Sequence, residues 1–439
     1  MNNLLLTPNL YAKFICMNLG TDLFVCKNMC HDVTPEFLAK KNPIGASVMV
    51  RKPYRFNVTK GLGYQPQPVV DTQTPVTVSQ VAGVAYDWDT LERTLQIRTG
   101  DAMNGKQVAG LNDLFAGPAA RALASKINSE AATFVADNTA NNVGTLGSPP
   151  STQDTYIRGG DLLIAQGLPS AAAAELVLII NRRMSTAFIN GTTGYYNPQA
   201  VISQQLEDGE MVDRLMGYKI EKDQTINRHS NGAFTGTPLC NGATAQTGAG
   251  GNNGTMTLSI DGFTGVSGSC QLTKGTKFTI GSATSATIGG VNSVHPQTKQ
   301  DTGYQQCFTV LANTTDLAGA MATLQIAPAI TPVTVDSQYA NVTGGAVDNA
   351  IITIVGASTV TGDQGILMHP QAFAFVSVPL IGPDPGEGAV VEKVTDEETG
   401  ITLQLIKAFD SRTMTHIHRV DVLYDFAPLY RELACVIQA

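Results

Sequence analysis

The chain has 439 residues, of which 43% are hydrophobic and 15% are charged, and its formal net charge is -8. This length allows two or three packed cores, whereas an acidic chain is poorly suited to gripping nucleic acid by neutralising phosphates. Charged residues normally make up about a quarter of a sequence. A surface so poor in charge favours a chain that covers much of its exterior with copies of itself.

Neither a membrane span nor a disulfide framework is predicted. The densest apolar run, from Glu175 to Ile180, is much shorter than the roughly 18 residues that a spanning helix needs. The initial MNNLLL lacks the basic stretch and the cleavage site of a secretory signal. The seven cysteines are odd in number and lack paired spacing. We therefore expect a cytoplasmic product with reduced cysteines.

The first 95 residues predict an N-terminal arm followed by an extended hairpin. Apolar residues recur with helical spacing from Leu19 to Met29, and Pro35 ends the pattern. Strand signals dominate from residue 45 to 95. Three prolines, Pro66, Pro68 and Pro75, lie between the two strand-like stretches of this range. Because proline cannot donate to a β-ladder, we expect this segment to be extended, without hydrogen bonds that fold it back on its own subunit.

A long helix and a mixed segment of helix and strand are predicted next. Apolar residues recur with helical spacing from Leu111 to Phe134. A second helix is predicted over residues 159–168. Residues 174–189 (AELVLIINRRMSTAFI) predict a buried strand that runs into a helix, which is the alternation of a mixed sheet domain.

Between residues 230 and 347 the chain nearly stops carrying charge, and Gly, Thr, Ser and Asn dominate. Short segments alternate apolar and polar residues with the period of two that places every second side chain in a core. The clearest are Met256–Ile260, Phe278–Ile280, Phe308–Val310 and Leu324–Ile326. About six such strands predict a small barrel or sandwich inserted into one body formed by the flanking segments. Residues 390–436 predict paired antiparallel strands.

Two groups of histidine and cysteine could bind a metal. His416 and His418 lie two apart on a predicted strand, but no third ligand is evident, so we interpret them as solvent-facing or interface histidines. Cys26, Cys30 and His31 resemble half of a zinc site without its second half, which favours a structural core.

Other motifs give no catalytic set. The run GPDPGEG from Gly382 and the following EKVTDEETG could hold calcium or act as acid and base, but a solvated hairpin turn explains them. Lys60 could form an isopeptide bond, but no partner asparagine is identifiable. The chain has no phosphate loop, nucleophile elbow, metalloprotease motif or dinucleotide fingerprint. We expect no catalytic residue, no cofactor and no metal.

Taken together, these segments resemble the major capsid (coat) proteins of tailed bacteriophages, specifically the P22 coat-protein family. The strongest stretches are KGTKFTIGSATSATIGGVNSVHPQTKQDTGYQQCFTV from Lys274, TLQIAPAI from Thr323, GILMHPQAFAFVSVPL from Gly365 and VTDEETGITLQLIKAFDSRTMTHIHRVDVLYDFAPLYRELACVI from Val394. The resemblance covers most of the chain and is clearest from about Gly254 to the end.

The resemblance implies an α+β fold of the HK97-like capsid type with an inserted all-β barrel domain. In that fold a peripheral domain carries a long spine helix, an extended hairpin called the E-loop reaches over a neighbouring subunit, and an axial domain meets its copies at capsomer centres. The implied domains are the N-terminal arm (1–50), E-loop (51–82), peripheral domain (83–154), first part of the axial domain (155–227), inserted barrel (228–347) and completion of the axial and peripheral domains (348–439).

The implied function is that of a structural major capsid protein, not an enzyme, which self-assembles into an icosahedral phage head enclosing double-stranded DNA. Its main partner would be itself, as pentamers and hexamers, with scaffolding and portal proteins, weakly contacted DNA and no membrane. It would lie in the virion, and in the host cytoplasm during assembly. Intersubunit contacts are expected at Arg55, Lys60, Tyr64, Asn241 and Asn252.

One departure from the family is evident. The loop LCNGATAQTGAGGNNG from Leu239 has no charged residue, so the family's salt bridges between capsomers are not expected on it. Two other classes remain open. An α/β enzyme with a β-barrel binding insert would need a convergent nucleophile, base and oxyanion donors. A β-rich tail or adhesion protein would favour fibrous repeats.

Overall fold

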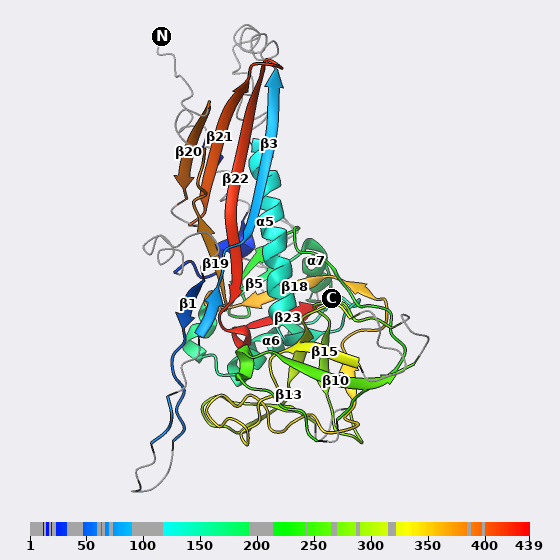
Figure 1. Cartoon of the computed structure of the whole chain (residues 1–439). Coiled ribbons are helices and arrows are strands. Elements are labelled where there is room, and N and C mark those ends of the chain that lie inside the picture. The colour runs from blue at the N-terminus through cyan, green and yellow to red at the C-terminus, as the bar shows by residue number, and fades with distance from the viewer. Residues whose placement is uncertain are drawn as a thin grey trace. The chain divides into compact units, whose positions relative to one another are not determined.

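A computed structural model of the chain contains two compact units (Figure 1). The first comprises Met1–Val50, Pro75–Ala131 and Ala374–Ala427, and the second Arg51–Thr74, Ala132–Phe373 and Pro428–Ala439. The structure describes residues 12, 15, 16, 19, 23–32, 47–58, 63, 66–69, 73–89, 117–192, 214–242, 244–264, 270–286, 290–314, 322–383, 388–396 and 400–439. In these residues no helix is long and apolar enough to cross a lipid bilayer.

The first unit is built on a five-stranded sheet in which long strands run side by side (Figure 1). Its strands are β3 (Gln80–Asp89), β19 (Phe373–Val378), β20 (Ala389–Thr395), β21 (Thr402–Asp410) and β22 (Thr415–Pro428). Both β21 and β3 pair with β22 in antiparallel register. The cross-strand pairs Leu403–Val422 and Leu405–Val420 are buried, and the predicted antiparallel pairing is confirmed. The intervening Gln404 and Asp421 are buried as well, so both faces of the sheet are covered at this point.

Two helical segments of the first unit are tied to its strands and to each other. The short helix α2 (Phe24–Lys27) is linked to α5 (Gly117–Asn138), because the Val25 backbone N–H donates to Asn128 Oδ1 at 2.8 Å. The Tyr424 hydroxyl on β22 bonds to the Glu130 carboxylate on α5. The predicted long helix is therefore confirmed from Gly117 onward, whereas residues 111–116 lie outside the described residues.

The second unit contains a mixed six-stranded sheet in the order β4-β23-β18-β5-β7-β6. Parallel pairs join β23 to β4 and β5 to β7, and the other pairs are antiparallel. The strands are β4 (Asn141–Gly144), β5 (Val177–Ile180), β6 (Arg214–Leu215), β7 (Tyr218–Lys222), β18 (Gln364–Met368) and β23 (Ala434–Gln438).

Two helices and a 3-10 turn accompany this sheet: α6 (Gln153–Ala165), α7 (Arg182–Thr192) and η2 (Ser170–Glu175). Tyr156 of α6 and Phe188 of α7 pack edge to face at 5.2 Å in the same buried cluster as Leu178 and Ile180 of β5. Because residues two apart on a strand share one face, both helices cover the same side of the sheet. The predicted strand-to-helix segment is confirmed, and the predicted second helix begins earlier than expected.

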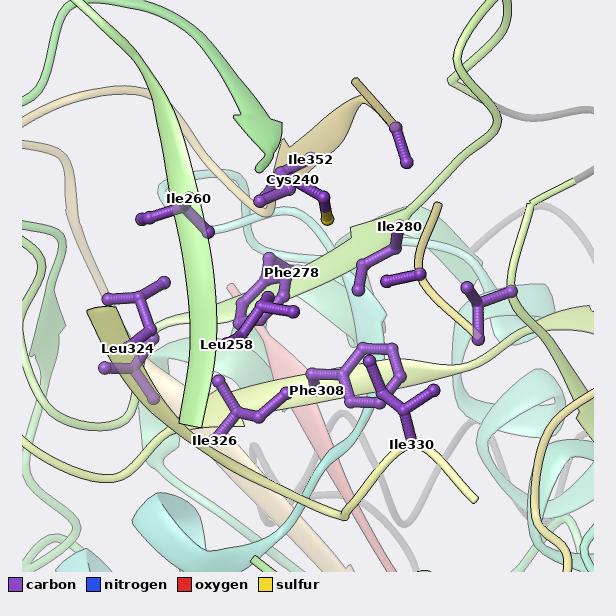
Figure 2. Packing of buried hydrophobic residues seen from close by; sticks show 14 of the residues in the cluster. Cys240, Leu258, Ile260, Phe278, Ile280, Phe308, Leu324, Ile326, Ile330 and Ile352 are labelled. Atoms are coloured by element: carbon purple, nitrogen blue, oxygen red, sulfur yellow. The ribbon is translucent and has the colours of Figure 1, made fainter. Parts of the chain in front are cut away.

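The charge-poor segment forms a separate six-stranded antiparallel sheet in the order β16-β11-β14-β15-β10-β9. Figure 2 shows apolar side chains from these strands meeting in one core, with Phe278 and Phe308 stacked at 5.7 Å. The four predicted alternating segments all lie in strands. The strands are β9 (Gly236–Cys240), β10 (Met256–Phe263), β11 (Lys277–Ile280), β14 (Cys307–Val310), β15 (Ala322–Ala327) and β16 (Ile352–Ile354).

The two ends of this sheet are joined to each other. Leu239 of β9 forms an isolated antiparallel bridge with Ile351, directly before β16. The Cys240 N–H donates to the Ala350 carbonyl at 2.9 Å. The strand β16 follows residue 347, where the sequence analysis placed the end of the insert. Beside this sheet lie two small ladders, β12 (Asn292–Val294) with β13 (Asp301–Gln305), and β8 (His229–Ser230) with β17 (Thr361–Gly362).

The predicted hairpin begins with a short ladder of β1 (Val48–Arg51) and β2 (Gln73–Val76). The expectation that this segment makes no hydrogen bonds to its own subunit is wrong. Asn57 Nδ2 donates to Ser337 Oγ at 2.7 Å, and Gln338 Nε2 donates to the Pro68 carbonyl at 3.0 Å. Proline lacks the amide donor but keeps its carbonyl, which remains a hydrogen-bond acceptor.

Candidate intersubunit site

A hollow of about 290 Å³ in the second unit collects residues from parts of the chain that are distant in sequence. The segment after β1, the turn before β10 and the short 3-10 turn η4 (Arg431–Leu433) all contribute to its lining. The lining includes Lys52, Arg55, Asn252, Asn253, Tyr430 and Glu432.

Glycines shape the turn that carries Asn252. Gly250 and Gly251 have φ angles of +94° and +57°, and the 3-10 turn η3 (Gly251–Asn253) follows. Only glycine adopts such left-handed conformations without cost. At Gly251 a Cβ would come within 2.3 Å of the Tyr339 carbonyl oxygen, so the backbone approach also excludes a side chain. The turn is therefore held close against the chain that carries Tyr339.

An ion pair closes one side of the hollow. Arg55 Nη2 lies 3.0 Å from Glu432 Oε1, and the Glu432 side chain is almost fully buried at 4% exposure. The two residues are 377 positions apart in sequence. A buried carboxylate costs much free energy unless it is paired, so this contact joins the segment after β1 to the C-terminal part of the chain.

Lys52 supplies a second cation to the same hollow. The residue is 8% exposed, and its Nζ lies 5.2 Å from the centre of the Tyr430 ring. Among the described residues Nζ has no hydrogen-bond partner. The pKa of Lys52 is lowered to about 8, mainly by burial; Glu432 opposes this effect, and the cationic Arg431 and Arg55 add to it. In this structure, the negative charge near Lys52 therefore does not offset the free-energy cost of burying its ammonium group.

The residues predicted to make intersubunit contacts have three outcomes. Arg55 and Asn252 line the same hollow. Asn241 lies elsewhere, where its Nδ2 donates to Asp261 Oδ2 at 2.9 Å. Lys60 and Tyr64 lie outside the described residues. Their role between subunits remains a prediction in every case.

The sequence analysis did not single out Lys52 and Glu432, the other two charged residues of the hollow. Lys52 and Arg55 stand close together in a chain of low charge, which was the available signal. Glu432 gave no such signal, because its pairing partner is remote in sequence. A local pattern cannot report which distant segment supplies a countercharge.

The histidines interpreted as solvent-facing or interface residues differ from each other. His418 is 6% exposed and stacks on Tyr86 at 5.4 Å, so the solvent-facing expectation is wrong for this residue. Its neighbour on the next strand explains this, because Tyr86 of β3 is directly paired with it. His416 packs against Phe409 at 4.9 Å.

The predicted core role of the Cys26, Cys30 and His31 group holds for Cys26, which is fully buried. Cys30 and His31 are only partly buried: Cys30 Sγ donates to Asp32 Oδ2 at 3.6 Å, and His31 packs edge to face on Phe375 at 5.8 Å. Residues 384–387 and 397–399 of the two acidic runs lie outside the described residues. Among the residues that can be described, no three His, Cys, Asp or Glu side chains are grouped to hold a metal ion.

Comparisons with solved structures found chains of phages and of a virus-like particle at low sequence identity. A chain from Mycobacterium phage Che8 has 12% identity and a TM-score of 0.43, covering 94% of this chain and 90% of that one. The cyanophage P-SCSP1u capsid has 9% identity and a TM-score of 0.37, covering 91% and 84%. A virus-like particle from Pyrococcus furiosus has 8% identity and a TM-score of 0.38, covering 98% and 97%. A search of curated proteins gave no match.

The family comparison is more direct. The model described as "P22 coat protein - gene protein 5" matches residues 109–436, which is more than half of the 439-residue chain. The match includes the long helix α5, the mixed sheet of the second unit and the charge-poor sheet. The chain therefore belongs to the P22 coat protein family and is a structural major capsid protein of a tailed bacteriophage.

Proposed function

We propose that many copies of this chain build an icosahedral head that encloses double-stranded DNA. The family match over residues 109–436 is the observation that carries this proposal. The copies would form pentamers at the five-fold vertices of the shell and hexamers between these vertices. Closed symmetry repeats each contact many times, so modest contacts give a stable shell.

The proposed architecture is the HK97-like fold. The helix α5 (Gly117–Asn138) would be the spine helix, residues 51–82 the E-loop, and the mixed sheet of the second unit part of the axial domain. The arm (1–50) and the segments 83–154, 155–227 and 348–439 keep the roles that the resemblance implies. Support for this assignment comes from the family match and from the long helix at the expected place.

The charge-poor sheet would be the inserted β-barrel domain. Its support is the Leu239–Ile351 bridge, which links the two ends of the sheet, and the shared core of Figure 2. Because β16 belongs to this sheet and β8 pairs with β17, we place the insert between residues 228 and 362. The ladder of β8 and β17 would be its two-stranded connection to the flanking body.

The remaining partners follow from the role of a shell. Scaffolding and portal proteins would direct assembly in the host cytoplasm, before the finished shell becomes part of the virion. A chain of net charge -8 would contact the packaged DNA only weakly. The work of such a protein needs no catalysis and no cofactor.

The hollow would be one of the intersubunit contacts. Arg55 and Asn252 lie in its wall, and the exposed Tyr54 and Phe56 lie on the segment that carries Arg55. Lys60 and Tyr64 belong to the same proposed E-loop, and Asn241 to the loop of the insert. Exposed aromatic residues and arginine are favoured at the centres of protein interfaces.

Co-expression with the scaffolding protein tests the proposal. We expect closed shells in electron micrographs and a fast-sedimenting fraction that contains this chain. A product that stays monomeric under every assembly condition would contradict the proposed function. A hydrolytic activity that co-purifies with the monomer and disappears with its unfolding would favour the enzyme alternative instead.

A further inference from the structure

The hollow beside Lys52 has an unbalanced set of buried charges. Lys52 and Arg431 are each 8% exposed, and Arg55 lies near enough to Lys52 to lower its pKa. Glu432 is the one carboxylate that acts on the Lys52 ammonium, and it is already paired with Arg55. Two buried cations, together with Arg55 at 30% exposure, therefore share one anion. Buried charges are normally paired, so the set lacks negative charge.

Several polar atoms in the wall are also unsatisfied. Lys52 Nζ, Glu432 Oε2 and Asn253 Oδ1 are buried and have no hydrogen-bond partner among the described residues. Such groups normally find a partner in a native protein. The space of about 290 Å³ is much larger than the roughly 30 Å³ that one water occupies. It can therefore admit a side chain together with part of its backbone.

We propose that this hollow binds the carboxylate of an aspartate or glutamate side chain from a second copy of the chain. This inference rests on the proposed function, since it names the group that enters one intersubunit contact. The incoming carboxylate accepts hydrogen bonds from Lys52 Nζ and from the Arg55 guanidinium. Backbone N–H groups of the incoming segment supply the donors that Glu432 Oε2 and Asn253 Oδ1 lack.

Charge and surface favour a second copy as the source of the carboxylate. The chain has 36 acidic residues against 28 basic ones, so acidic side chains are abundant on its copies. The segment that carries Lys52 and Arg55 also exposes apolar side chains, with Phe56 at 60% and Val58 at 96% exposure. A second copy covers these apolar groups and the hollow together, whereas a nucleic-acid phosphate covers only the hollow.

Zero-length cross-linking tests the pairing directly. Shells are assembled without nucleic acid from an equal mixture of unlabelled and ¹⁵N-labelled chains and treated with a water-soluble carbodiimide, which joins amines to carboxylates in contact. Mass spectrometry then shows whether Lys52 is joined to an Asp or Glu of its own copy or of another. We expect cross-linked peptides of mixed isotope composition, with Lys52 as the amine partner.

Variants give an independent readout. Replacement of Lys52 by methionine keeps an unbranched side chain of similar length and removes the charge that lies over the Tyr430 ring. Loss of one member of a buried charge pair should raise the protein concentration needed for shell formation by roughly tenfold or more. The matched control is Arg412→Gln, which removes an exposed cation in the turn before β22. Thermal unfolding of each monomer shows whether the variants fold.

The outcomes separate the inference from the proposed function. Normal shells in which Lys52 is joined only to its own Glu432, or to no carboxylate, overturn the inference while the proposed function stands. If an amine-reactive label is also applied to both kinds of shell and spares Lys52 only in shells that contain DNA, the inference is overturned in favour of a phosphate. If Lys52→Met misfolds, the cross-linking of the wild-type chain still decides. Absence of shells from the wild-type chain overturns both.

Discussion

Lys277 Nζ lies 2.5 Å from the carbonyl oxygen of Ala136 and donates a hydrogen bond to it. Lys277 belongs to β11, in the charge-poor sheet, and Ala136 to the last turn of α5. The same Nζ also donates to the Thr139 carbonyl and, at 2.9 Å, to Thr309 Oγ1. Carbonyls at the end of a helix lack hydrogen-bond partners within the helix. A fully buried lysine thus supplies the cap and ties the sheet to the helix.

Replacement of Lys277 by methionine should lower the free energy of unfolding by about 1–3 kcal/mol, because buried carbonyl oxygens lose their donor. Lys274→Met is the matched control. Lys274 is 46% exposed and pairs with Asp137 at 3.2 Å, a surface pair worth roughly 0–1 kcal/mol. Denaturant unfolding of the monomer measures both variants. Equal effects would show that Lys277 does not act as a cap.

Lys277 should also give the stability a distinct pH dependence. Burial lowers its pKa to about 7, from 10.5 for an ordinary lysine. Between these two values the unfolded chain binds more protons at this site than the folded chain, so the contribution of Lys277 to stability increases as pH rises. The stability of wild type minus that of Lys277→Met should therefore increase from pH 7 to pH 10. A difference that is flat or decreases over this window contradicts the assignment.

The turn that carries Asn252 should be sensitive to a single methyl group. Gly251→Ala places a Cβ 2.3 Å from the Tyr339 carbonyl oxygen, so the turn must move and the hollow must change shape. Gly303→Ala is the control, because Gly303 also has a positive φ but no atom lies within 4 Å of its Cβ. We expect Gly251→Ala to lower the melting temperature more and to reduce shell yield. Equal melting temperatures would contradict the close approach.

The proposed insert should fold as an isolated fragment if its boundaries are placed correctly. A fragment of residues 228–362 contains β16, which pairs with β11 and whose preceding residue bridges to β9. We expect dispersed amide resonances in its NMR spectrum. A fragment of residues 228–348 lacks β16 and should be markedly less stable. Random-coil spectra from the longer fragment would mean that its core depends on the flanking body.

Deletion within the proposed E-loop should separate folding from assembly. Residues 59–65 are removed and replaced by a short Gly-Ser turn. This deletion spares Asn57 and Gln67, whose hydrogen bond from the Asn57 N–H to Gln67 Oε1, at 2.8 Å, joins the two sides of the loop. We expect a folded monomer with a nearly unchanged melting temperature and a severe loss of shells by sedimentation. Contacts of a few kcal/mol per copy are lost at every subunit. Normal shells would show that this segment makes no essential contact.

Local pattern was enough to predict most of the elements of this protein. Period-two alternation at Leu258, Phe278, Phe308 and Leu324 predicted strands that the structure contains, with all four side chains buried. Helical spacing likewise predicted α5, and the buried run that leads into a helix predicted β5 and α7. These predictions succeed because a strand or helix with one buried face must repeat apolar residues at its own period.

Only the tertiary structure decided which segments meet. The pairing of Arg55 with Glu432, the burial of His418 against Tyr86 and the capping of α5 by Lys277 each join residues that are far apart in sequence. The closure of the charge-poor sheet by the residues before β16 is of the same kind. Periodicity indicates that one face of an element is buried, but it does not indicate which segment covers that face. A charged side chain can be buried only if the fold brings a partner of opposite charge or a hydrogen-bonding group next to it.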